Sequence, residues 1–417
     1  MDVKTIFKST SVNLLASFIV KISFFIATYL LAKYSNDQNV ANFGLVVVTL
    51  GAFQSFITMG LGVTAVKVAT AKKNNSIEEI SYGFYCISII YHVSFLIFLI
   101  FIFLFKEFIL NILINSTFIY DNFTLLILVL YFQCACDIKY SFNIGLGKFL
   151  NNLLANIIGV IGFSLSLLYF IFIDSSFGIF TAWLSLSVGS WIVLYCYKNK
   201  FNFFYLAKNH LNFRLSDLKS ILSFAIPVFL ASLIVAPVNF IVIGMYTKVE
   251  NAHSIIALIT IANQLLGMFA IIPVIFSQVL ASRINLDVSY SQVKMCGIII
   301  FFVSLLFVGL FSIFVDSFLN AYNLDIISKN TLLLALGVGV LLGVQAQFDT
   351  FNLCNGASRI HLVLNILFSV IFILCAYFLE KTAFNYVYSR FLGYTVRLII
   401  LFCYLSLKNK NNMYVKL

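Results

Sequence analysis

Residues 15–26 read LASFIVKISFFI, and residues 230–241 read LASLIVAPVNFI. A shift of the sequence by 215 positions superposes these two apolar stretches together with their flanks. The match continues further along the chain at shifts of 210 and 209 positions, which small loop deletions explain. Polar residues match as well, so the chain carries a duplicated unit and two lobes are expected. The matching polar pairs at the first shift are Asp2 with Asp217, Lys4 with Lys219, Ser17 with Ser232, Lys33 with Lys248 and Asn36 with Asn251.

The amino-acid composition is typical of a protein that spans a lipid bilayer. Hydrophobic residues make up 62% of the chain and charged residues 10%, with a mean hydropathy of +1.04, whereas soluble domains carry about 25% charged residues. Twelve apolar stretches are close to or above the roughly 20 residues that cross the hydrocarbon, without the alternation of barrel strands. The expected spans are 10–34, 41–66, 81–105, 122–145, 150–173, 177–197, 218–246, 254–281, 296–319, 331–354, 360–379 and 384–407.

These spans predict an all-α integral membrane protein of about 12 transmembrane helices in two parallel six-helix lobes with a central cavity. Six spans separate the two copies of the repeat, and because six is even, both copies enter the membrane from the same side. The cleft between the lobes is then the natural place for a substrate. We expect an N-terminal lobe at 1–197, a cytoplasmic linker at 198–217 and a C-terminal lobe at 218–417.

The basic residues behind the net charge of +11 lie mostly in the loops between the expected spans. With the N-terminus in the cytoplasm, 17 of the 26 Lys and Arg residues lie in cytoplasmic segments and five on the opposite side. This positive-inside bias predicts that both termini lie in the cytoplasm. It also explains the excess of basic residues, so the net charge does not indicate a nucleic-acid partner. No Gly-rich phosphate loop for ATP occurs. The eight cysteines lie in or at the ends of the spans, with neither metal nor redox spacing, and we expect no metal and no cofactor.

Four basic residues lie inside expected spans: Lys21, Lys139, Arg390 and Arg397. Each costs about 2.5–3.5 kcal/mol at the centre of a lipid-facing helix, so each should face protein or a watery cavity. Lys21 lies in the middle of its span, where snorkelling to either interface is hardest. It therefore indicates either a cationic group for an anionic substrate or an ion pair with a buried acid.

The last span carries a polar stripe. Tyr386, Arg390, Tyr394 and Arg397 advance by 4, 4 and 3 residues and share one face of a helix. The two guanidiniums are then about 10 Å apart, which suits a pyrophosphate or an acidic sugar. Arg397 can alternatively be an interfacial residue that snorkels to the nearby surface.

The fourth and tenth spans, which correspond to each other in the repeat, are unusually polar. The fourth carries Asp137 beside Lys139, and the tenth carries Asp349 beside Gln345. The two acids are candidates for a proton or cation site, or for pairing Lys21 and the arginines; simple hydration near the cytoplasmic surface is the other interpretation. We add Lys139 and Gln345 to the candidate substrate-binding residues.

The seventh span holds two prolines. Pro227 and Pro237 each remove a helical hydrogen bond and bend the helix. The corresponding residues of the first lobe, Val12 and Ile22, are not proline, so the lobes should differ in curvature. Either a hinge for alternating access or a static kink is expected here.

Twelve spans in two parallel lobes occur together with the local motifs Leu31-Ala32-Lys33-Tyr34, Phe43-Gly44 and Gly60-Leu61-Gly62. In this arrangement the chain resembles the polysaccharide (O-antigen type) flippases, whose superfamily also contains multidrug and toxin extruders and lipid II flippases. The resemblance implies a non-enzymatic transporter that moves an undecaprenyl-pyrophosphate-linked oligosaccharide from the cytoplasmic to the outer leaflet of a bacterial inner membrane by alternating access. It implies a cavity lined by basic and aromatic residues. Beyond the lipid-linked substrate and membrane lipids, a polysaccharide polymerase and a chain-length regulator are the implied partners.

Other functions are less consistent with the residues. A cation-coupled multidrug extruder of the same superfamily should place carboxylates in its cavity, but span 10–34 has Lys21 and no acid. A major-facilitator transporter should have a Gly-rich basic loop after its second span, and residues 67–81 contain no glycine. A polysaccharide polymerase or ligase should have a large outer loop, whereas the longest one expected here is 106–121.

Overall fold

A computed structural model describes residues 3–72, 76–173, 178–196, 215–274, 277, 290–322, 324, 328–354 and 358–414. The predicted linker at 198–217 lies mostly outside these residues. Within the described part there is no strand, and 12 helical segments are long and apolar enough to cross a membrane. The predicted all-α fold with twelve spans is therefore confirmed, while the lobe boundaries and the cytoplasmic position of the termini stay predictions.

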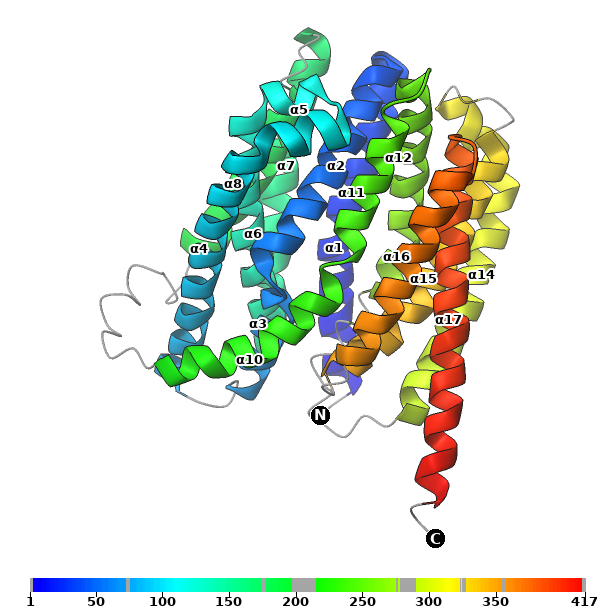
Figure 1. Cartoon of the computed structure of the whole chain (residues 1–417). Helices are drawn as coiled ribbons and strands as arrows, with labels where there is room; N and C mark the ends of the chain where they lie inside the picture. Colours follow the sequence, from blue (N-terminus) through cyan, green and yellow to red (C-terminus); the bar gives the residue numbers. More distant parts are fainter. Residues whose placement is uncertain are drawn as a thin grey trace.

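Most of the long helices run side by side along one common direction, with α10 as an oblique exception (Figure 1). The N-terminal half comprises α1 (Val3–Tyr34), α2 (Asp37–Thr58), α3 (Leu61–Ala71), α4 (Ile77–Glu107), the π-helix η1 (Phe108–Ile114), α5 (Thr117–Asp121), α6 (Phe123–Leu146), α7 (Phe149–Ile173) and α8 (Gly178–Cys196). The C-terminal half comprises α10 (Leu215–Ser232), α11 (Val235–Tyr246), α12 (Ala252–Phe269), α14 (Tyr290–Ala321), α15 (Ser328–Cys354), α16 (Ser358–Phe378) and α17 (Ala383–Tyr414).

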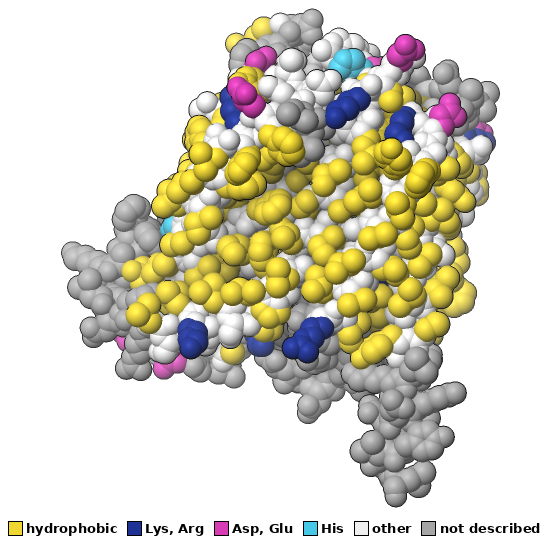
Figure 2. Space-filling model, in the orientation of Figure 1, with side chains coloured by type: hydrophobic (Ala, Val, Ile, Leu, Met, Phe, Trp, Pro, Cys, Tyr) yellow, Lys and Arg dark blue, Asp and Glu magenta, His cyan; other side chains and the backbone are white. Residues whose placement is uncertain are grey.

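The surface of the bundle is a broad apolar belt. Figure 2 shows hydrophobic side chains covering the middle of the visible face, with the charged ones gathered above and below. Large apolar side chains such as Leu104, Ile313 and Phe378 are 74%, 71% and 77% exposed. Such exposure over many helices is expected where lipid tails replace water, so the chain is a multi-pass membrane protein.

The predicted span 41–66 is interrupted. Met59 and Gly60 both adopt left-handed backbone conformations, with φ of 45° and 70°, and separate α2 from α3. A Cβ atom on Gly60 would lie only 2.9 Å from the backbone nitrogen of Phe229 in α10. The prediction of one continuous helix was wrong here because α10 crosses directly over the turn, where only glycine fits.

The seventh span is also divided. α10 ends at Ser232 and α11 starts at Val235, and α10 lies obliquely across the lower end of the bundle while α11 stands upright (Figure 1). Pro237 provides the physical reason, since it has no N–H for the Leu233 carbonyl and its ring crowds that carbonyl. Pro227 lies within α10. The bend is therefore present, and its use as a hinge stays a prediction.

The two halves of the chain are in contact mainly through α2, which packs against α11 and α12. The closest approach is at Gly44, where a Cβ atom would lie 1.8 Å from Thr260 Oγ1. Phe53 and Phe240 extend the contact, with ring centroids 5.6 Å apart. The absence of a side chain at Gly44 lets α2 and α12 touch near the Asp37 end of α2.

We predict that Gly44→Ala loosens this contact and lowers stability by about 1–3 kcal/mol, the range typical of overpacking. Thermal unfolding of the detergent-purified protein measures the effect. Gly51→Ala in the same helix is the control, because a Cβ atom there meets nothing within 4 Å. Thr260→Ala should partly restore the Gly44→Ala variant, and equal stability of the two glycine variants would contradict the interpretation.

Candidate functional site

A polar cavity lies among helices of the N-terminal half and reaches α12 of the C-terminal half. It consists of two adjoining cavities of about 400 Å³ each that share part of their lining. The walls come from α1, α2, α6 and α7 in both parts and from α8 and α12 in one part. We call it the polar cavity, and its shared polar lining consists of Lys21, Gln54, Asp137, Tyr140 and Asn156.

Lys21 projects into the polar cavity from the middle of α1. Its side chain is exposed to this cavity although the helix around it is apolar. The Lys21 Nζ lies close to α12, since a Cβ atom on Gly267 would be in ordinary van der Waals contact with it at 3.9 Å. Among the described residues, Lys21 forms neither a hydrogen bond nor an ion pair. The ammonium group is thus accessible to a ligand.

Asp137 lines the same cavity from α6. Its carboxylate accepts a hydrogen bond from Gln54 Nε2 of α2, and Gln54 Oε1 in turn accepts one from Gln133 Nε2 at 3.1 Å. Within the described structure, Asp137 and Lys21 face the same cavity without forming an ion pair. Both charges therefore depend on water or on a ligand in the cavity.

A chain of amide contacts holds the floor of the polar cavity together. Tyr140 donates its hydroxyl hydrogen to Asn156 Oδ1, and Asn156 Nδ2 donates to the Ala16 carbonyl at 2.8 Å. Asn152 Nδ2 donates to the Tyr140 carbonyl at 3.1 Å. These bonds connect α6, α7 and α1, so the helix that carries Lys21 is fixed relative to the helix that carries Asp137.

Sequence analysis did not select Gln54 or Asn156 as site residues. Gln54 lies in α2 and meets Asp137 across a separation of 83 positions, which no local pattern reveals. A signal for Asn156 does exist, because the repeat aligns it with Asn365. Because asparagine occurs at this position in both copies of an otherwise apolar repeat, the repeat could have identified Asn156 as a candidate site residue.

Lys139 lies away from the polar cavity. Its side chain is fully buried, and its Nζ is 3.8 Å from the centroid of the Phe84 ring, with Tyr195 and Phe142 at 5.6 and 6.0 Å. Cation–π attraction to three rings stabilises an ammonium that has left water. The structure therefore places this predicted substrate-binding residue inside an aromatic box between α4, α6 and α8.

Arg390 lies directly behind the cavity wall. Its Nη1 donates to Asn263 Oδ1 at 2.6 Å, and Asn263 of α12 lines the polar cavity. The guanidinium also lies 5.9 Å from the ring of Tyr386, which is 1% exposed and packs against Tyr246. Arg390 thus reaches the cavity through Asn263.

Arg397 belongs to a separate buried cluster. Its Nη2 donates to Asp349 Oδ2 at 2.6 Å, and Asp349 Oδ1 lies 3.0 Å from His361 Nδ1. Asn365 Nδ2 lies 3.2 Å from His361 Nε2. Arg397 is 4% exposed, so its charge is compensated by Asp349 within the protein. Sequence analysis named an arginine as one partner for Asp349, and it did not select His361.

The two remaining predicted residues, Tyr394 of α17 and Gln345 of α15, have structural contacts. Tyr394 stacks on Phe368 with ring centroids 4.2 Å apart. Gln345 Nε2 donates to the Tyr394 carbonyl at 2.7 Å, and Gln345 is 1% exposed. The predicted stripe therefore does not present one cationic face, since its residues divide between a wall contact at Arg390 and the buried Arg397 cluster.

The polar cavity offers an amine, a carboxylate and several amides, a set suited to binding rather than to covalent chemistry. Lys21 can pair with an anion, while Gln54 and Asn156 are groups that hydrogen-bond to hydroxyls. In the described part of the chain, no group of three or more His, Cys, Asp or Glu residues could hold a metal ion.

The architecture defines the class of protein: a multi-pass membrane protein with the fold of the MATE transporters of the MOP superfamily. An inward-facing multidrug resistance MATE family transporter has a TM-score of 0.69 at 13% identity, covering 96% of this chain and 94% of that chain. The MATE multidrug transporter DinF-BH, solved in a complex, has a TM-score of 0.70 at 13% identity, and the match covers 96% of this chain and 95% of that chain. The lipid II flippase MurJ in an inward closed conformation has a TM-score of 0.66 at 15% identity, and the match covers 94% of this chain and 86% of that chain.

No family model and no curated protein matches the sequence. At these identities the similarity establishes the fold alone. The similar structures include both drug transporters and a lipid flippase. The choice between those two functions therefore depends on the residues of the polar cavity.

We predict that Asp349→Asn destabilises the protein by about 3–5 kcal/mol, because it leaves the buried Arg397 guanidinium without its counterion. Asp316→Asn is the matched control. It breaks the surface pair in which Asp316 Oδ1 lies 2.7 Å from Lys329 Nζ, with the Lys329 side chain 36% exposed and the Asp316 side chain 69% exposed. This change should alter stability by less than about 1 kcal/mol. Thermal unfolding in detergent compares the two variants, and equal effects would contradict the prediction.

Proposed function

We propose that this protein is a flippase in a bacterial inner membrane. Its substrate is an undecaprenyl-pyrophosphate-linked oligosaccharide, the repeat unit of an O-antigen type polysaccharide, which it moves from the cytoplasmic to the outer leaflet by alternating access. The observation that carries the proposal is Lys21, an ammonium group at mid-membrane that lines the polar cavity without a partner among the described residues.

The chemistry of the substrate explains why such a cation is needed. A pyrophosphate head group is strongly anionic, and its transfer into a cavity of low dielectric requires a positive charge close by. Lys21 supplies that charge, and Arg390 adds a second one behind Asn263. The amides of Gln54 and Gln133 line the cavity and suit the hydroxyl groups of sugars.

Alternating access requires the two halves to separate where they now touch. The contact of α2 with α12 at Gly44 closes the Asp37 end of the bundle. The bend between α10 and α11 lies toward the opposite end (Figure 1). We propose that α2 and α12 separate at Gly44 to open the Asp37 end, and that the bend before Pro237 lets α10 swing to open the opposite end, so that access alternates between the two ends.

We predict that Lys21→Ala lowers transport about ten- to hundredfold, the loss expected for one charge-assisted contact with the substrate. The measurement is the surface polysaccharide of a strain that depends on this gene, with the amount of protein checked in the membrane. Lys21→Arg should retain activity. Lys33→Ala, at the end of the same helix and outside the cavity lining, is the control. Arg390→Ala should also lower the amount of surface polymer. Normal polymer in both Lys21→Ala and Arg390→Ala would eliminate the cationic-cavity proposal.

A cation-coupled multidrug extruder is the second candidate, and Asp137 favours it. Sequence analysis discounted this function because the first span lacks an acid, but Asp137 brings a carboxylate into the same cavity from α6. The similar protein DinF-BH is itself a multidrug transporter. A carboxylate in a hydrated cavity can bind a cationic drug or a coupling ion.

Proteoliposomes distinguish the two candidates. We predict that a proton or sodium gradient drives no accumulation of a cationic dye, because Lys21 repels a cation that enters the polar cavity. Gradient-driven uptake of the dye that disappears in Asp137→Asn would establish the extruder instead. Glu380→Gln, at the end of the bundle and outside the cavity lining, controls for the loss of an acidic residue.

A further inference from the structure

A second cavity of about 320 Å³ lies between α3, α4 and α10, apart from the polar cavity. It is located where α10, from the C-terminal half of the chain, crosses onto helices of the N-terminal half (Figure 1). Its volume is within the range of small-ligand sites, about 300–1,000 Å³. We call it the crossing pocket, and its lining includes Lys67, Lys72, Tyr82, Asp217, Ser220 and Phe224.

Two ammonium groups are held at this pocket by neutral partners. Lys67 Nζ lies 3.6 Å from the centroid of the Phe224 ring. Lys72 Nζ lies 3.4 Å from the Glu79 carbonyl oxygen and 5.5 Å from the Tyr82 ring. Neither contact neutralises the positive charge, so both lysines can still bind an anion.

Asp217 adds a carboxylate to the lining from the first turn of α10. Among the ion pairs of the described residues, none joins Asp217 to Lys67 or Lys72. Positive and negative groups thus surround one cavity without compensating each other. A ligand that carries a phosphate and an ammonium group a few bonds apart would satisfy both signs at once.

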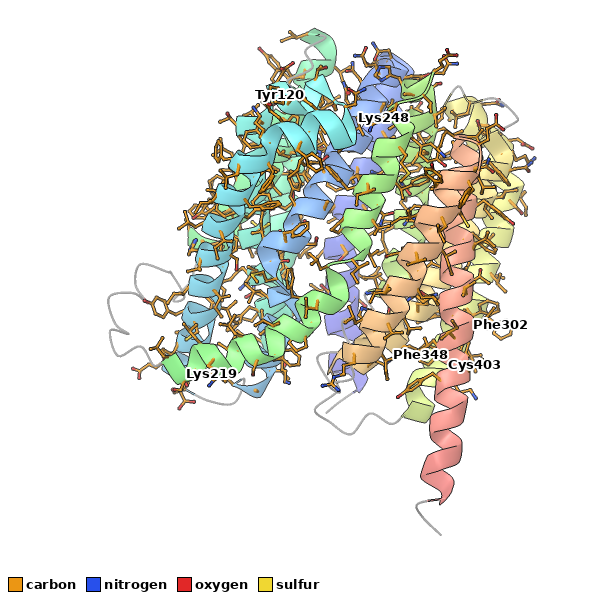
Figure 3. All side chains as sticks on the ribbon, in the orientation of Figure 1. Tyr120, Lys219, Lys248, Phe302, Phe348 and Cys403 are labelled. Carbon is orange, nitrogen blue, oxygen red and sulfur yellow. The ribbon has the colours of Figure 1, made fainter. Side chains whose placement is uncertain are left out.

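The crossing pocket lies at the level where the apolar spans begin. The candidate spans start at Glu78 for α4 and at Leu215 for α10, and the short apolar helix α3 ends at Ala71. Lys219 of α10 is drawn at this lower end of the bundle (Figure 3). Residues at the ends of spans are expected among the headgroups of the bilayer, so this location favours a phospholipid headgroup as the ligand.

We propose that the crossing pocket binds the phosphoethanolamine headgroup of a membrane phospholipid. The phosphate lies between Lys67 and Lys72, and the ammonium group pairs with Asp217. Because the lysines belong to the N-terminal half and the carboxylate to α10, the bound headgroup ties the two halves of the chain together. It stabilises the oblique position of α10 that the bend before Pro237 permits.

Native mass spectrometry of the purified full-length protein tests the proposal. The protein is titrated separately with phosphatidylethanolamine, phosphatidylglycerol and phosphatidylcholine. Phosphatidylethanolamine should be retained best. Lys67→Ala should weaken its retention roughly tenfold, which corresponds to about 1.4 kcal/mol, and Asp217→Asn should remove the preference over phosphatidylglycerol. Lys219→Ala is the matched control, since Lys219 lies on α10 but outside the pocket lining.

Three results would overturn the proposal. One is equal retention in Lys67→Ala and Lys219→Ala, and another is equal binding of phosphatidylethanolamine and phosphatidylglycerol by the unaltered protein. The third is saturation by soluble phosphoethanolamine at the same concentration as by the lipid, which would identify a soluble ligand. If Lys67→Ala does not fold, Lys67→Gln and Lys67→Arg replace it, and only the arginine variant should retain the lipid. Because the assay requires no transport, failure of the flippase proposal would leave its outcome unaffected.

Discussion

A charged or polar group inside the hydrocarbon must be hydrated or paired, and this requirement determines how the whole protein is arranged. The two halves of the chain meet it differently. In the N-terminal half, Lys21 and Asp137 line the polar cavity without pairing. In the C-terminal half, Arg397 and Asp349 form a compact ion pair with His361 beside it. Lys21 and Asp137 thus stay accessible in a cavity, whereas Arg397 and Asp349 hold α15, α16 and α17 together.

The duplication acquires a physical meaning from this difference. Asn156 and Asn365 are repeat mates, yet Asn156 contributes to the polar cavity and Asn365 to the Arg397 cluster. Lys21 corresponds to Ala236, and Pro237 corresponds to Ile22. The repeat therefore supplies a common scaffold of spans. Its unshared residues supply a mid-membrane cation in one half and a broken helix in the other.

The sequence predicted that each basic residue inside a span faces either protein or a watery cavity, without deciding between the two. The structure shows both outcomes, since Lys21 lines the polar cavity and Lys139 is buried among aromatic rings. Predictions that required a partner were less complete. The helical stripe of Arg390 and Arg397 looked like one binding face, but Asn263 and Asp349 from other helices separate the two guanidiniums into different environments.

The sequence by itself determined the number of spans, the duplication and the presence of charges that had to avoid lipid. These properties depend on hydropathy and on comparison of the chain with itself. Only the tertiary structure decided which charges meet, because partners such as Gln54 and Asp137 lie on helices far apart in sequence. It also decided that the span 41–66 breaks at Gly60, where α10 crosses the backbone so closely that only glycine fits. Hydropathy does not detect that break, whereas the bend near Pro237 follows from the proline in the sequence.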